Sequence, residues 1–208
     1  MPAWRGSCPG SGRAISPRRA RTAEGEALWR EDARSAERRD AWRRAGMIRT
    51  VPSKRLRLNV GDVFRLPIDA SRVGYGQIVG RYGRSAYYLA IFEQPYEFGE
   101  EPRVADIVRG RIALLALSLD ALLYHGEWTI VGRGTLPPID WPTYKEAVAP
   151  DVWEAVDHTG TARRPVERFE AEGLPFRSVV APIVVQDALR SLHGVGQWND
   201  AYDKLRHG

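Results

Sequence analysis

The side chains in this sequence that could do chemistry include four histidines and a single cysteine. The histidines are His125, His158, His193 and His207. None lies three or four residues from another histidine or beside a cysteine, so the spacing gives no support to a metal site. The lone Cys8 excludes an internal disulfide framework and a cysteine metal cluster. The sequence therefore predicts neither a metal nor a cofactor.

Hydrolytic chemistry has little support from the motifs. The sequence contains no G-x-S-x-G nucleophile elbow and no H-E-x-x-H pair. A hydrolase with a dispersed site that uses His125 or His158 stays open as an alternative, because a Ser-His-Asp set need not be visible in sequence. Both histidines fit surface or turn positions, and we predict that the protein is not an enzyme and has no catalytic residues.

The glycines of the segment 74–80 invite comparison with a nucleotide-binding loop. Their spacing is G-x-G-x-x-x-G rather than G-x-G-x-x-G, and no helix is predicted to follow them. Glycines within a strand more often mark a bulge or a tight bend. We therefore expect these glycines to serve packing.

Aromatic residues are concentrated in the region that follows. Aromatic side chains in strands mostly pack in the core, and the alternative is an exposed face that uses them as binding anchors. Because neighbouring strand residues point to opposite faces, only one of Tyr87 and Tyr88 is expected to be exposed. The candidate contact residues on such a face are Tyr75, Tyr87, Tyr88 and Trp128.

From Met47 onward, short apolar segments alternate with turn residues, which is typical of β-strands. In the first of them, Phe64, Leu66 and Ile68 share one face. A hairpin connection is expected at 82–85. The strands predicted to form an antiparallel meander are residues 63–68, 74–80 and 86–92.

The second half of the chain gives a mixed pattern. Residues 111–118 favour a buried strand over a helix because only eight residues separate a glycine from a predicted turn. A short helix is predicted at 104–108, a strand at 126–132, a proline-rich extended loop from 136 to 142, and helices at 186–193 and 198–205. The predicted fold is α+β and β-rich, with a twisted antiparallel sheet or small barrel and C-terminal helices.

Charge divides the chain into two parts. Residues 1–46 hold eleven arginines, no lysine and six acidic residues, a net charge of +5, and residues 47–208 hold twenty basic and twenty acidic residues. The segment 47–208 therefore lacks the basic surface that phosphate binding uses. We predict that residues 1–46 are a disordered arginine-rich leader; alternatives are a basic nucleic-acid arm, an interaction helix or a start codon placed too early.

The apolar segments are short. The longest run, 112–119, is far too short to span a bilayer, and no basic start followed by an apolar stretch marks a secretory signal. A cytoplasmic protein without membrane contact is the expectation.

Three segments resemble the immunity protein 26 family. They are the Gly-Asp turn with its apolar strand at 61–67, the Gly-Tyr-Gly strand at 74–80 and the Gly-x-Trp strand at 126–132. The resemblance covers roughly residues 57–145 and leaves 150–208 unassigned. It implies that 47–208 is a single immunity-type domain, encoded beside a bacterial polymorphic toxin.

The resemblance implies inhibition by binding: the protein would occlude the active site of a cognate toxin domain. Its partner would be that toxin domain rather than nucleic acid or membrane, and the family supplies no catalytic residues. The alternative from a different class is a small-barrel nucleic-acid-binding module or ribonuclease, whose affinity would fall steeply with salt. The neutral charge of 47–208 argues against it.

Overall fold

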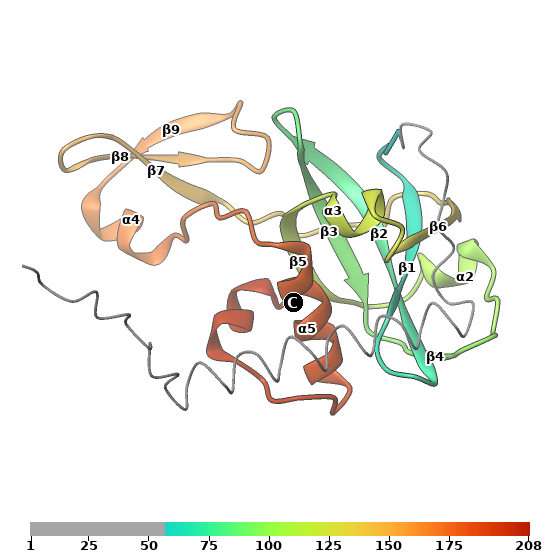
Figure 1. The fold of residues 1–208 in the computed structure, drawn as a ribbon. Coiled ribbons are helices and arrows are strands. Elements are labelled where there is room, and N and C mark those ends of the chain that lie inside the picture. Colours follow the sequence, from blue (N-terminus) through green and yellow to red (C-terminus); the bar gives the residue numbers. More distant parts are fainter. Residues whose placement is uncertain (1–56) are drawn as a thin grey trace, which may run out of the picture. The chain divides into compact units, whose positions relative to one another are not determined.

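The computed structural model describes residues 57–208, so the predicted leader and the boundary at residue 46 lie outside the described part of the chain. These residues form two antiparallel sheets and several short helices (Figure 1). In chain order the elements are β1 Asp62–Pro67, β2 Arg72–Tyr82, β3 Ala86–Phe92, β4 Tyr96–Glu97, α2 Val104–Ile107, β5 Ile112–Leu119, α3 Ala121–Tyr124, β6 Thr129–Arg133, β7 Tyr144–Ala149, β8 Val152–Val156, β9 Arg163–Val166, α4 Arg168–Gly173, α5 Pro182–Leu192 and the 3-10 helix η1 Asp200–Leu205.

The first sheet has six strands in the order β5-β3-β2-β1-β6, with β4 paired to one end of β2. Strands β1, β2 and β3 form the predicted antiparallel meander. The β2–β3 hairpin turns at Gly83, whose φ of 60° is the left-handed conformation that glycine adopts without strain. The sheet is twisted and open, with β5 and β6 at its two ends (Figure 1). The predicted twisted sheet is therefore confirmed, and the small-barrel alternative is wrong.

Both faces of the first sheet are buried because its central strands carry apolar side chains on both sides. All seven residues of β3 are buried. In and just after β1, Phe64, Leu66 and Ile68 enter one apolar cluster, whereas Val63 enters the other. The prediction that Phe64, Leu66 and Ile68 share one face is confirmed. Because both faces of the sheet are apolar, other elements of the chain must cover each of them.

The first face is covered by α5, α3 and η1. Val185, Ala188 and Leu189 of α5 are completely buried against this face of the sheet. Trp128, just before β6, stacks on Phe64 with ring centroids 5.1 Å apart. Its indole Nε1 donates a 2.8 Å hydrogen bond to the Gln186 Oε1 atom of α5, which satisfies both polar groups in the core.

The second face is covered by α2 and by the proline-rich loop between β6 and β7. Ile107 and Val108 are buried there, and Ile139 and Trp141 pack against the same cluster. The extended loop predicted for 136–142 and the helix predicted at 104–108 are thus confirmed. The strand interpretation of 111–118 is also confirmed, as β5.

The glycines of β2 permit close packing. A Cβ atom on Gly74 would lie 2.6 Å from Leu189 Cδ2, and one on Gly76 would lie 2.7 Å from Ile91 Cδ1 and closer still to Phe64 Cζ. The β2–β3 register shifts between Ile78 and Gly80, which marks a bulge. These glycines therefore serve packing and strand bending, as predicted.

The second sheet was not foreseen from the sequence. It has three strands in the order β7-β8-β9, and α4 follows the last of them. Strands β8 and β9 lie in a part of the chain for which the sequence predicted no element. The helix predicted at 186–193 is confirmed as part of α5, and the helix predicted at 198–205 is the 3-10 helix η1.

Truncation of Leu189 to alanine should destabilise the fold strongly. The residue is completely buried in the first cluster, and such truncations cost about 2–5 kcal/mol. Chemical denaturation of Leu189→Ala measures the loss. The matched control is Ile183→Ala on the same helix, which is 47% exposed and should change little. Equal effects of the two variants would contradict the packing described here.

The substitution Gly76→Ala should also destabilise the protein. The added methyl group would overlap Phe64 and Ile91 between two paired strands, and overpacking of this kind costs about 1–3 kcal/mol. The control is Gly173→Ala in α4, where the same group meets nothing within 4 Å. A thermal midpoint unchanged by Gly76→Ala would show that the sheet accommodates the methyl group.

Candidate protein-binding surfaces

The four aromatic residues predicted as contacts are core residues. Tyr75, Tyr87, Tyr88 and Trp128 are each at most 8% exposed. Tyr87 and Tyr88 point to opposite faces, as strand alternation requires, and enter different apolar clusters. Because both faces of the sheet are covered, neither is exposed, so the expectation that one of them is exposed is wrong. Their contact with a partner stays a prediction.

Tyr75 nevertheless reaches a surface cavity. Its hydroxyl lies 3.5 Å from the Glu100 carbonyl, a distance at the outer limit of a hydrogen bond. Burial raises the pKa of Tyr75 above its ordinary value, so the group is a neutral donor. Arg65 lines the same cavity of about 490 Å³, and its guanidinium lies 5.7 Å from the centroid of the Phe98 ring.

Tyr88 joins the two sheets. Its hydroxyl donates a 2.8 Å hydrogen bond to the His158 carbonyl in the β8–β9 turn. The His158 ring stacks on Trp141 with centroids 3.9 Å apart, and both rings meet Tyr88 edge-on. Burial raises the pKa of Tyr88 above its ordinary value, which keeps this donor protonated. The residue anchors the turn on the first sheet.

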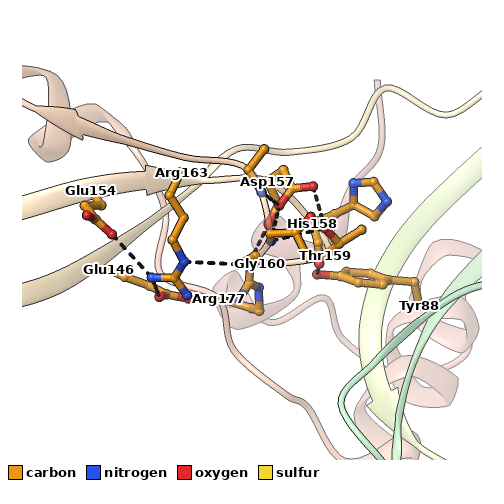
Figure 2. A network of polar contacts seen from close by, with 11 residues as sticks. Tyr88, Glu146, Glu154, Asp157, His158, Thr159, Gly160, Arg163 and Arg177 are labelled. Atoms are coloured by element: carbon orange, nitrogen blue, oxygen red, sulfur yellow. Dashed lines mark hydrogen bonds and ion pairs between the residues drawn. The ribbon is translucent and has the colours of Figure 1, made fainter.

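Arg177 is the second link between the sheets, and Figure 2 shows it beside Glu146 and Asp157 of the second sheet and its turn. Its side chain is 6% exposed, and its Nη1 atom lies 2.9 Å from Glu146 Oε1 in β7. Its Nη2 atom donates to the Asp157 carbonyl. The guanidinium lies over Tyr82 of β2 at 4.2 Å and over Tyr144 of β7 at 4.9 Å. One cation thus contacts both sheets and the β8–β9 turn.

The β8–β9 turn is itself ordered by Asp157. Its carboxylate accepts hydrogen bonds from the Thr159 hydroxyl and from the backbone N–H groups of Thr161 and Ala162. These bonds, that from Thr159 first, lower the pKa of Asp157 to about 2. The turn therefore presents a fixed backbone to Tyr88 and Arg177.

The second sheet and α4 expose apolar side chains around this anchored core. Phe169 of α4 is 89% exposed, and Phe176 is 59% exposed. Trp153 meets Phe176 edge-on with centroids 5.9 Å apart. We define the second-sheet surface as Trp153, Phe169 and Phe176. Sequence reasoning overlooked it because these three aromatic residues stand apart in the sequence rather than in a run.

A cavity of about 540 Å³ opens beside Phe176, a size typical of a binding pocket. Its floor is the middle of β5, the edge strand of the first sheet. The rest of the lining consists of residues 140–142, Tyr144, Pro175, Phe176, Ser178 and residues 204–208. The cavity therefore lies where the second-sheet surface meets the first sheet, and Phe176 belongs to both.

The structure of residues 57–208 can be compared with the predictions about metal sites, histidines and membrane contact. Within 57–208 no group of three or more His, Cys, Asp or Glu side chains could hold a metal ion. His158 is packed against Trp141 and Tyr88, and His125 meets Tyr124 edge-on. Over the same range, none of the helices has the length and apolar character needed to cross a membrane.

Comparison with known proteins identifies one family. The model of the immunity protein 26 family matches residues 59–149, which run from the turn before β1 to the end of β7. Searches of curated proteins and of solved structures find no match. The match includes the three segments on which the predicted resemblance depended, and that prediction is confirmed. Residues 59–149 of this chain are therefore similar to the immunity protein 26 family.

Proposed function

We propose that this protein is an immunity protein of the bacterial cytoplasm that binds a cognate polymorphic toxin and neutralises it by occluding the active site. The observation that carries the proposal is the family match over 59–149. The match to this family favours a role as a non-enzymatic inhibitor within a toxin–immunity pair. We infer occlusion as the mechanism, because a protein bound over the active site of the toxin would keep the substrate of the toxin out.

The structure supports inhibition through a preformed surface. Both faces of the first sheet are filled, and Arg177 and Tyr88 fix the second sheet to it. A surface on such a scaffold loses little conformational entropy on binding, which favours affinity. Exposed aromatic side chains on a fixed scaffold are typical anchors of protein interfaces.

The nucleic-acid alternative has weaker support from the charges. Residues 47–208 carry twenty basic and twenty acidic residues. Many of the arginines are already paired with carboxylates, among them Arg133 with Asp62 and Arg177 with Glu146. Such pairs leave little uncompensated charge for phosphate groups. We therefore retain a protein as the partner.

Co-expression tests the proposal directly. The full-length chain should restore growth of cells that express the toxic domain encoded by the neighbouring gene, and the two proteins should purify together. An unrelated toxic domain is the control and should kill in the presence of the chain. Continued killing by the neighbouring toxin, from cells that contain soluble folded chain, would refute the pairing.

A further inference from the structure

We infer that the second-sheet surface is the docking face for the toxin domain, with Phe169 and Phe176 as its two anchors. The inference rests on the proposed function and names the region that performs it. The expected occupant is a folded protein surface with an apolar pocket for each ring and a basic rim. Phe169, Phe176 and the strands β8 and β9 lie beyond the matched segment, so this face belongs to the part of the chain that the family model does not cover.

Phe169 is exposed although the helix that carries it is fixed. Lys145 of β7 donates a 2.8 Å hydrogen bond from Nζ to the Ala171 carbonyl of α4, and Ala171 is 2% exposed. Arg164 of β9 forms an ion pair with Glu170 of the same helix. The helix is therefore tied to β7 and β9 while its phenylalanine faces solvent. Because the helix that carries it is fixed, the Phe169 ring stays in contact with solvent until another molecule covers it.

Phe176 is placed beside a recess that a partner can enter. Its ring meets Trp153 edge-on, and the Lys145 ammonium lies 4.9 Å from its centroid. On its other side the ring lines the cavity of about 540 Å³ above β5. A side chain of the partner that enters this cavity would contact Phe176 and the β5 floor together, which is the arrangement of an interface hot spot.

The charges around the two anchors indicate the kind of partner. Residues 144–179 contain five basic and seven acidic residues. Within the described chain the arginines of this region are paired: Arg163 with Glu146 and Glu154, Arg164 with Glu170, Arg168 with Glu172, and Arg177 with Glu146. The slight acidic excess disfavours nucleic acid and anionic lipid. It complements a protein surface whose rim is basic.

The position of this face depends on Arg177, which we assign as a positioning residue. The substitution Arg177→Lys keeps a positive charge near Glu146. It removes the planar guanidinium that lies over the rings of Tyr82 and Tyr144 and the Nη2 group that donates to the Asp157 carbonyl. Hydrogen exchange of the β8–β9 turn should therefore become faster, whereas β3 should keep its protection. Unchanged exchange in the turn would show that Arg177 does not hold it.

The docking face is tested by binding of full-length variants to the purified toxic domain encoded by the neighbouring gene. Phe169→Ala and Phe176→Ala should each weaken binding about tenfold or more, as hot-spot truncations do. Tyr124→Ala, at an aromatic residue of α3 that is 64% exposed, is the matched control and should bind like the unchanged chain. Thermal unfolding of Phe169→Ala should match that of the unchanged chain, because the ring is 89% exposed.

The remaining outcomes separate this inference from the proposed function. Full affinity of both phenylalanine variants would overturn the inference while leaving toxin binding intact. If Arg65→Ala and Tyr75→Phe alone weaken binding, the docking face is the Tyr75 cavity and the inference is wrong. If the unchanged chain neither binds nor neutralises the toxic domain, the proposed function fails and the inference falls with it.

Discussion

Burial of both faces of the first sheet is the constraint on which the rest of the structure depends. β3 is buried along its whole length, and Phe64 and Val63 of β1 enter different clusters. A sheet that is apolar on both sides needs two covering layers. The helices α5 and η1 supply one, and α2 and the proline-rich loop supply the other. Much of the chain outside the meander can be understood as cover for it.

This constraint extends beyond the matched segment, which does not contain all of the elements that cover the first sheet. The match ends at residue 149, whereas Val185, Ala188 and Leu189 of α5 complete the first cluster. The bond between Trp128 and Gln186 joins the two regions directly. The matched segment provides the first sheet, and the rest of the chain provides α5 and η1 of one cover together with two strands of the second sheet.

The sequence predicted the first sheet well because its signals are local. Alternating apolar residues, glycine turns and a short hairpin loop each specify strands without reference to distant residues. The second sheet escaped because its strands are short and mix charge with apolar residues, as Val152, Trp153 and Glu154 do, and because Pro165 lies within β9. One face of this sheet packs against α4, and the other carries the ion pairs of Arg163 and Arg177 with Glu146.

The contact residues were harder to predict because their exposure depends on residues that are distant in sequence. Tyr75, Tyr87, Tyr88 and Trp128 look like binding anchors when composition alone is considered, yet three-dimensional cover makes all four core residues. Conversely, Phe169 stands between two charged residues and Phe176 follows Leu174 and Pro175, and only the fold shows that both phenylalanines are exposed. Arg177 could not be recognised as a link because its partners Tyr82 and Glu146 are distant in sequence.

The outer strand of the second sheet also bears on how the molecule avoids self-association. β9 reads Arg163-Arg164-Pro165-Val166, so its edge carries two cations and lacks one backbone donor. At the edge of the first sheet, Arg206 and Val180 form isolated bridges with Leu114 and Ser118 of β5. Edges of this kind are poor templates for growth of a sheet from one molecule into the next. Exposed phenylalanines can therefore be carried near these strands with little risk of fibre formation.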